Sequence, residues 1–404
     1  MRKTIPVAEL QFGMYVAELD RPWTDTPFRF QGFVLESAEQ LETLRKFCKV
    51  VYVDPDRAEV VARLPDQTIG PMKSKLDLSR TGKTKYVEQA PVEQEFGRAV
   101  SSHAASDKAM LESIVALRAG RTLDAQRVNE AVSGLTQSVL RNPDAMLLYT
   151  QLHEKGDYTQ SHALDVSVYM TAFGRFLEMS HEDIGLLGHL GLLQDVGKVR
   201  LPNELIEKRD RLTAQEFELA KKHVEYSAEI LREAAGLPAD LAELALLHHE
   251  RHDGSGYPKK LRGKEIGLIG SIAAIVDTFD ALTARRPYAE PLAPSTALSM
   301  LYKWRATFFD PFLVEQFIRC IGIFPIGSIV ELNSGESGIV IAQNLEKRLQ
   351  PRVMVVRDAG GNPIKPQKLI DLSRGPRLAS GELYRIRRTL EYGRIPVTAE
   401  NLFA

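Results

Sequence analysis

Residues 248–258 read HHERHDGSGYP, and this stretch carries more chemical information than any other part of the 404-residue chain. Two adjacent histidines precede acidic residues and a Gly-Ser-Gly-Tyr-Pro turn. Imidazole is the commonest side-chain metal ligand, and many divalent-cation sites combine it with carboxylates. Glycines let a backbone approach a ligand closely, and a proline then sets the direction of the chain. The stretch therefore predicts a metal site beside a loop that faces a substrate.

The sequence around this stretch predicts a mainly α fold. Between residues 91 and 322, apolar residues recur three and four positions apart, as in AVSGLTQSVLR, SVYMTAFGRFLEM and AELALLHHE. Prolines at 143, 202 and 238 indicate breaks between helices. A helical bundle can form a di-metal site from histidines and carboxylates that project inward from separate helices.

Shorter modules are predicted on both sides of the helical region. Residues 1–65 are predicted to form a small α/β module, with strands at MYVAEL and VVYV and a helix at SAEQLETLRKFCK. Residues 66–90 are polar and irregular, as is typical of a linker. The alternating segments GSIVEL, GIVIAQN and RVMVVRD predict a small antiparallel β module over 323–375, close in size to SH3-like barrels. Residues 376–404 are predicted to be a tail.

Composition narrows the class of protein. The formal net charge of −1 does not indicate electrostatic binding to nucleic acid or to an anionic membrane. The chain has two cysteines, Cys48 and Cys320, which do not suggest a disulfide framework. Apolar windows such as GLIGSIAAIV have about half the length of a membrane span. We expect a cytoplasmic protein that binds neither nucleic acid nor a membrane.

Further histidines and carboxylates in the helical region have apolar neighbours that would carry them into the bundle. They are His162, Asp195, His223, Asp277 and Asp280, and the amide side chain of Gln194 directly precedes Asp195. Because buried charges need partners or metals, we expect these side chains to meet. GLLQDVGK indicates a helix that Gly197 ends, with Lys198 near the mouth of the site.

GLLQDVGK, LPNELIEKRDRLTAQEFE, HHERHDGSGYP and VDTFDALTARRPY, in this order and spacing, resemble the HD-GYP family of phosphohydrolases. Members of that family hydrolyse cyclic di-GMP in bacterial signalling. The resemblance covers about residues 150–320 and implies an HD-type helical bundle. Residues 1–65 also resemble the small N-terminal domain that often precedes HD-GYP modules.

The resemblance implies two divalent ions, iron or manganese, and a role for each matching residue. The metal ligands would be His162, Gln194, Asp195, His223, His248, His249 and Asp277. Asp195 would bridge the ions, and Lys198 would face the scissile phosphate. The substrate loop would be Gly256, Tyr257 and Pro258, and Arg286 would contact the nucleotide.

The chain departs from the family pattern at three places. Gln194 stands where a metal-ligating histidine belongs, and an amide oxygen binds transition metals more weakly than imidazole does. The ion held by His162 and Asp277 would therefore be weakened. Tyr158, four positions before His162, replaces the glutamate of three-metal members, which predicts that the chain binds no third ion. Pro-Tyr-Ala-Glu after Arg286 lacks a further basic residue, so substrate contacts there would be weaker.

Supporting roles are predicted for other polar residues of the helical region. Asp280 is expected to be a hydrogen-bonding partner or a cap, and Glu250 and Asp253 are expected to orient neighbouring histidines. We expect surface or packing roles for a further set of histidines, namely His103, His153, His181 and His252. His189 lies off the helical face of Gln194 and is not expected to replace the missing histidine.

Three functional hypotheses remain open. The first is a phosphodiesterase that converts cyclic di-GMP to pGpG or GMP, in which the ions activate water and Lys198 and Arg286 stabilise the phosphate. The second is a degenerate receptor or scaffold that binds cyclic di-GMP, GGDEF-type diguanylate cyclases or other signalling proteins without turnover. The third is an HD enzyme for another nucleotide, which the complete GSGYP run disfavours.

Overall fold

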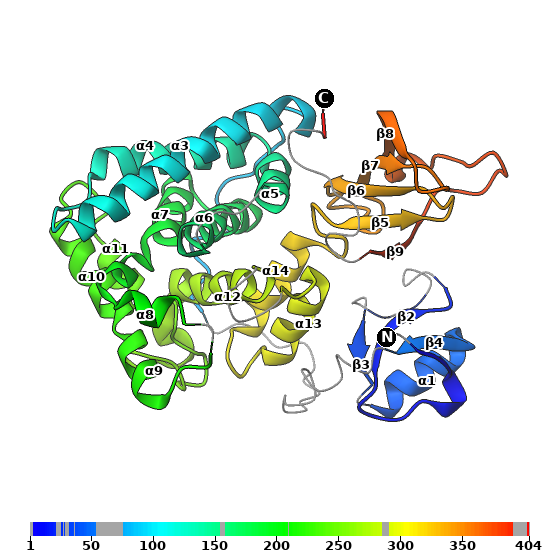
Figure 1. The fold of residues 1–404 in the computed structure, drawn as a ribbon, viewed down its shortest axis with the longest axis horizontal. Helices are drawn as coiled ribbons and strands as arrows, with labels where there is room; N and C mark the ends of the chain where they lie inside the picture. The colour runs from blue at the N-terminus through cyan, green and yellow to red at the C-terminus, as the bar shows by residue number, and fades with distance from the viewer. Residues whose placement is uncertain are drawn as a thin grey trace. The chain divides into compact units, whose positions relative to one another are not determined.

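The computed structural model describes residues 3–21, 26, 28, 32–35, 37–53, 76–153, 158–208, 210–284, 291–390 and 402–403. The chain divides into two compact units (Figure 1). The larger unit is made of Met72–Leu292 and Trp304–Cys320. The other unit is made of Met1–Pro71, Ala293–Lys303 and Ile321–Ala404.

The larger unit is a bundle of helices, which confirms the predicted mainly α fold. Its elements are α3 (Val92–Arg118), α4 (Ala125–Arg141), α5 (Pro143–Leu152), α6 (Tyr158–Phe176), α7 (His181–Leu193), η3 (Val196–Arg200), α8 (Asn203–Ile206), α9 (Ala214–Lys221), α10 (His223–Glu233), α11 (Leu241–Ala245), η4 (Gly263–Ile266), α12 (Gly267–Thr283) and α14 (Pro311–Ile321). Polar side chains begin several of these helices by accepting hydrogen bonds from free backbone N–H groups. Asn142, for example, accepts from Asp144 N, and Pro143 occupies the first turn of α5.

The helices α6, α7 and α12 form the centre of the bundle (Figure 1). Gly191 permits close packing between α6 and α7, because a Cβ atom there would lie 2.5 Å from Ser167 Cα. Val166 and Leu190, from these two helices, are fully buried. This close packing fixes the end of α7, from which the next residues of the chain enter the site.

One helix in the described part of the chain, Gly263–Thr283, is long and apolar enough to cross a membrane. This helix extends beyond the apolar window GLIGSIAAIV at both ends. However, 72% of its most apolar window is buried inside the protein. The same helix carries the buried residues Asp277 and Asp280. We interpret it as the core helix of the bundle.

The N-terminal module contains a four-stranded antiparallel sheet of order β1-β4-β2-β3. Its elements are β1 (Lys3–Pro6), η1 (Val7–Glu9), β2 (Tyr15–Leu19), β3 (Phe33–Val34), α1 (Ala38–Phe47) and β4 (Val50–Val53). Ser37 and Gln40 form a capping box at the start of α1. Val16, Leu44 and Val51 are fully buried where the helix covers the sheet. The predicted strands and helix of this module are confirmed.

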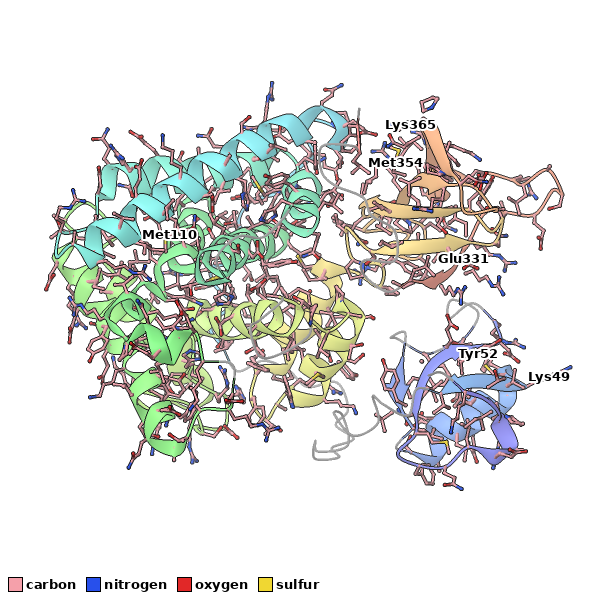
Figure 2. All side chains as sticks on the ribbon, viewed as in Figure 1. Lys49, Tyr52, Met110, Glu331, Met354 and Lys365 are labelled. Atoms are coloured by element: carbon pink, nitrogen blue, oxygen red, sulfur yellow. The ribbon has the colours of Figure 1, made fainter. Side chains whose placement is uncertain are left out.

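The C-terminal module is a five-stranded antiparallel sheet of order β8-β7-β6-β5-β9. Its elements are β5 (Ile329–Leu332), β6 (Ser337–Ala342), β7 (Arg352–Arg357), β8 (Pro363–Asp371), η5 (Leu372–Arg374) and β9 (Ile386–Thr389). The segment Ala293–Lys303, most of α13 (Pro294–Trp304), groups with the unit that contains both sheets. Met354 on β7 is buried, and Lys365 lies on β8 (Figure 2).

The prediction of a tail from residue 376 was wrong for residues 386–389, which form β9. This strand pairs with β5 and so covers an edge that would otherwise expose unpaired backbone groups. Ile386 is 3% exposed and belongs to the core of the module. Arg388 forms an ion pair with Glu331 of β5 at 2.6 Å. Residues 391–401 and 404 lie outside the described residues.

Candidate metal centre

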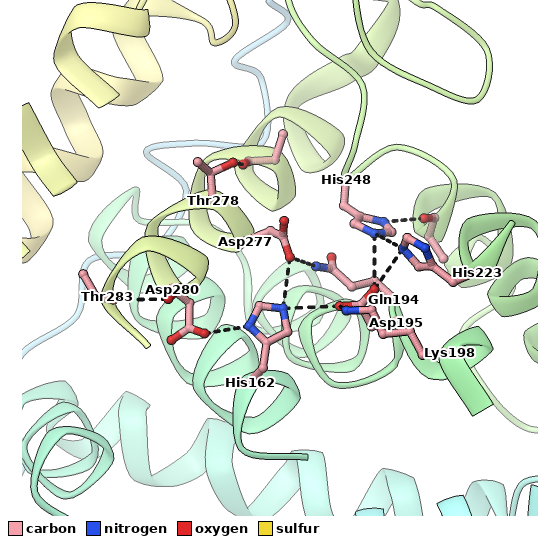
Figure 3. A network of polar contacts seen from close by, with 12 residues as sticks. His162, Gln194, Asp195, Lys198, His223, His248, Asp277, Thr278, Asp280 and Thr283 are labelled. Atoms are coloured by element: carbon pink, nitrogen blue, oxygen red, sulfur yellow. Dashed lines mark hydrogen bonds and ion pairs between the residues drawn. The ribbon is translucent and has the colours of Figure 1, made fainter. Parts of the chain in front are cut away.

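The histidines and carboxylates singled out in the sequence converge from separate elements of the bundle (Figure 3). Asp195 follows the end of α7, and His223 is the first residue of α10. The remaining members come from α6 (His162), from the segment after α11 (His248 and His249) and from α12 (Asp277). Because each element is held by its own apolar face, the polar side chains are forced together in the interior.

A first cluster contains His223, His248, His249 and Asp195. Asp195 Oδ1 lies 3.1 Å from His223 Nε2 and 3.6 Å from His248 Nε2. The two Nε2 atoms are 3.4 Å apart. One potential ligand atom from each of the four residues lies within 4.8 Å of the others. Imidazole nitrogens and a carboxylate at such spacing are a donor set for a transition-metal ion.

A second cluster contains His162, Asp195 and Asp277. His162 Nε2 lies 3.3 Å from Asp195 Oδ2 and 3.2 Å from Asp277 Oδ1. Asp195 thus presents Oδ1 to the first cluster and Oδ2 to the second (Figure 3). This is the arrangement that a carboxylate shared by two ions requires.

Hydrogen bonds from the Nδ1 atoms orient three of the imidazoles. His223 Nδ1 donates to Ala220 O at 2.6 Å, and His248 Nδ1 donates to Ala245 O at 2.8 Å. His162 Nδ1 lies 2.6 Å from Asp280 Oδ2. A proton held on Nδ1 leaves the Nε2 lone pair available to a metal. Asp280 therefore has the supporting position expected of it.

The sequence did not indicate that the carbonyl oxygens of Ala220 and Ala245 orient His223 and His248. The prediction that Glu250 and Asp253 orient neighbouring histidines was wrong. Glu250 is fully buried and accepts hydrogen bonds from Lys259 N at 2.7 Å and Leu261 N at 3.0 Å. Asp253 accepts from Ser255 N at 2.9 Å. Both carboxylates therefore shape the loop that follows the histidines. These backbone partners could not be predicted from residue types, because every residue carries a backbone carbonyl.

The GSGYP loop packs directly against the first cluster. A Cβ atom on Gly256 would lie 2.4 Å from Arg251 N and 2.5 Å from His249 O, so only glycine fits there. Tyr257 N donates to His249 O at 3.2 Å. The Tyr257 ring stacks on the imidazole of His249, with 4.7 Å between ring centroids. The loop and the metal cluster are therefore one packed unit.

Gln194 contacts the second cluster and is 1% exposed. Its Nε2 donates to Asp277 Oδ1 at 3.3 Å. Its Oε1 is buried and has no hydrogen-bond partner among the described residues. An unsatisfied buried carbonyl oxygen costs free energy, and a cation beside it would supply the missing interaction. The residues present therefore fit a bound cation at this position.

The electrostatics of the site set the protonation states that cation binding needs. Burial lowers the pKa of His223 and lowers that of His249 well below the ordinary value, which keeps both imidazoles neutral. Burial alone would raise the pKa of Asp195, but Lys198 and the surrounding histidines hold it well below the usual range. Burial likewise opposes ionisation of Asp277, and His162 outweighs it and lowers the pKa. Neutral imidazoles and ionised carboxylates are the metal-binding forms.

The other predicted positions are placed as follows. Lys198 lies in η3, and its Nζ contacts Asp195 Oδ2 at 2.7 Å.

The prediction that Gly197 ends a helix was wrong, because α7 ends at Leu193. A Cβ atom on Gly197 would lie 2.2 Å from His223 O, so the glycine permits close contact with α10. Arg286 and the side chain of Tyr158 lie outside the described residues. His189 does not replace the missing histidine, because its nitrogens contact Gly185 O and Asn129 Oδ1, each at 2.8 Å.

Comparisons with known proteins agree with this architecture. A family profile described as HD domain matches residues 125–313. A domain of unknown function matches residues 2–128, and a KOW domain associated with HD domain matches residues 329–379.

Similar proteins include a cyclic di-GMP phosphodiesterase of Pseudomonas aeruginosa, which is 32% identical over 93% of this chain and 90% of that protein. A 3'3'-cGAMP-specific phosphodiesterase of Vibrio cholerae is 37% identical over 40% of this chain and 31% of that protein. The solved structure of an HDG"Y"P protein from Bdellovibrio bacteriovorus is 15% identical with a TM-score of 0.46, and the match covers 78% of this chain and 98% of that one. The chain belongs to the HD-GYP family of HD-domain proteins.

Proposed function

We propose that this protein is a metal-dependent phosphodiesterase that hydrolyses cyclic di-GMP to pGpG or GMP in bacterial second-messenger signalling. The observation that carries the proposal is the position of Asp195, which presents one oxygen to each of two donor clusters. The adjoining GSGYP loop supports it, and so does the name of the relative from Pseudomonas aeruginosa, a cyclic di-GMP phosphodiesterase. We place the activity in the cytoplasm, with GGDEF-type diguanylate cyclases as candidate partners.

The two clusters would each hold one divalent ion, iron or manganese. Asp195 would be shared, with His223, His248 and His249 on one side. The residues on the other side would be His162, Asp277 and Gln194. When bound, such ions lower the pKa of a coordinated water and neutralise charge that develops on phosphate oxygens.

The chain's own residues would position the substrate beside this centre. Lys198 has 24% of its side chain exposed, and its Nζ lies 2.7 Å from Asp195 Oδ2. It would stabilise negative charge on the phosphate. The loop residues Gly256, Tyr257 and Pro258 would hold the nucleotide near His249, and Arg286 would add a further contact from its segment.

A second candidate function is a receptor or scaffold that binds cyclic di-GMP without turnover. Gln194 is the observation that favours it, because an amide replaces imidazole in one of the two donor sets. A centre that holds only one ion would retain the substrate loop and lose the second charge that stabilises the transition state.

The two candidates are separated by a turnover assay on the full chain loaded with Mn²⁺ or Fe²⁺. Cyclic di-GMP is added, and pGpG and GMP are measured by chromatography. The Asp195→Asn variant is the control, since it keeps the side-chain shape and removes the shared charge. Hydrolysis by the wild type that is lost in the variant supports the phosphodiesterase. Stoichiometric binding by calorimetry with no product supports the receptor. Preferential hydrolysis of 3'3'-cGAMP would reject the proposed substrate.

A further inference from the structure

A third group of potential metal ligands lies outside the centre described above. It consists of His103 on α3, His153 directly after α5, and Asp165 on α6. One potential ligand atom from each of the three residues lies within 4.8 Å of the others. His103 is 3% exposed, Asp165 is fully buried and His153 is half-buried. The sequence predicts surface or packing roles for both histidines, and no motif connects them with Asp165.

The two imidazoles are held in place by the same aromatic side chain. His153 stacks on Tyr149 with 5.1 Å between ring centroids, and His103 meets the edge of that ring at 4.9 Å. His153 Nδ1 lies 3.1 Å from Tyr149 O. A carbonyl oxygen only accepts hydrogen bonds, so Nδ1 carries the proton and Nε2 keeps its lone pair in the neutral ring. His223 and His248 are oriented by backbone carbonyls in the same way.

A buried carboxylate such as that of Asp165 is stabilised by a positive charge beside it, and the neighbouring imidazoles suggest two sources of that charge. One protonated imidazole would form an ion pair, which needs a single histidine. Here the two imidazole centroids are only 4.6 Å apart, so two protonated rings would repel each other. A divalent cation uses both neutral imidazoles and the carboxylate together. The cation therefore accounts for all three residues.

We propose that His103, His153 and Asp165 bind a divalent first-row transition-metal ion, separate from the HD-GYP centre. Two imidazoles and one carboxylate form a donor set used for zinc and for Fe(II), with remaining positions open to water. The site joins α3, α5 and α6, which pack against one another. It differs from the third-ion position of three-metal HD-GYP members, where this chain has Tyr158. The bound ion would stabilise the position of α6, the helix that also carries His162.

The proposal is tested by counting ions on the full chain. The protein is stripped with a chelator, reloaded with Co²⁺ and desalted, and cobalt per chain is measured by mass spectrometry of the metal. The comparison is between Asp195→Asn, which disables the HD-GYP centre, and the double variant Asp195→Asn/Asp165→Asn. We expect the second substitution to remove one ion per chain and the corresponding cobalt d–d absorption.

His153→Gln provides an independent variant, because His153 is half-buried at a helix end and its replacement leaves the packed interior intact. We expect it to weaken cobalt binding at this site while circular dichroism stays unchanged. Equal cobalt counts with and without Asp165→Asn in folded protein would overturn the proposal and identify the cluster as an ion pair. A folded Asp195→Asn chain that binds no cobalt would overturn it as well. Either result leaves the proposed phosphodiesterase untouched, because turnover is assayed separately.

Discussion

Gln194 Nε2 donates a hydrogen bond to Asp277 Oδ1 at 3.3 Å, while Gln194 Oε1 is buried with no hydrogen-bond partner in the described part of the chain (Figure 3). The amide nitrogen thus anchors the side chain, and the oxygen remains available to a cation. The glutamine is buried without disturbing the helices around it, so we expect its effect to fall on metal affinity and not on the packing of the bundle.

Replacing Gln194 by histidine is expected to strengthen binding of the weaker ion by about 10-fold or more, because imidazole is the better transition-metal ligand. Manganese titration followed by calorimetry measures this affinity, and turnover of cyclic di-GMP should rise with it. His189→Gln on α7, the helix that directly precedes Gln194, is the matched control, since both ring nitrogens of His189 contact groups outside the centre. An unchanged second-ion affinity in Gln194→His would show that residue 194 is not a ligand.

Asp280→Asn is expected to lower metal affinity by about 10- to 100-fold, although Asp280 is not itself proposed as a ligand. Its carboxylate accepts from His162 Nδ1 at 2.6 Å, and an uncharged amide would make that imidazole a weaker donor to the metal. Metal content after dialysis is the measurement. Asp358→Asn, in the C-terminal module, should leave metal content at the wild-type level. Equal retention of metal by the Asp280 variant would argue against the orienting role.

Gly256→Ala is expected to displace the substrate loop and to destabilise the protein by about 1–3 kcal/mol, because the added Cβ would meet backbone atoms at 2.4–2.5 Å. Loss of the Tyr257 stack on His249 should raise the KM for cyclic di-GMP. Steady-state kinetics and thermal unfolding provide the two measurements. Gly185→Ala on α7 is the control, since a Cβ there meets nothing within 4 Å and should stabilise the helix by about 0.5–1 kcal/mol. Similar behaviour of the two alanine variants would contradict the close-packing argument.

Stability of the metal-free protein is expected to fall as pH drops below about 6.5. Burial lowers the pKa of His223 and His249 in the folded state. Between the unfolded and the folded pKa values, only the unfolded chain takes up these protons, so acidification favours unfolding. Each such histidine contributes a slope of up to about 1.4 kcal/mol per pH unit.

Denaturant unfolding of chelator-treated protein between pH 7.5 and 5.5 measures this slope. His249→Gln should flatten it, because one of the titrating groups is removed. His181→Gln, which replaces an exposed histidine, is the matched control and should keep the wild-type slope. Parallel slopes for His249→Gln and the wild type would show that burial does not set the protonation of this imidazole.

The amino-acid sequence was sufficient to predict the mainly α bundle and both flanking modules. Helical spacing of apolar residues and alternation in strands are local signals, so they can be followed along the chain without tertiary contacts. The motifs HHERHDGSGYP and GLLQDVGK also carried the family resemblance and the choice of ligand residues. Strand β9 was missed because its pairing with β5 is a long-range contact, and the short segment IRRT has little local strand signal.

Only the tertiary structure showed how the donor atoms of the site are arranged. The two oxygens of Asp195 lie in different clusters. Hydrogen bonds to backbone carbonyl oxygens orient His223 and His248. The tertiary structure also brought His103 next to Asp165, which is 62 positions away in the chain. Sequence motifs specify which side chains are present, whereas the packing of whole helices decides which of their atoms meet. Backbone partners and contacts between distant helices leave no local pattern, and for that reason they could not be predicted.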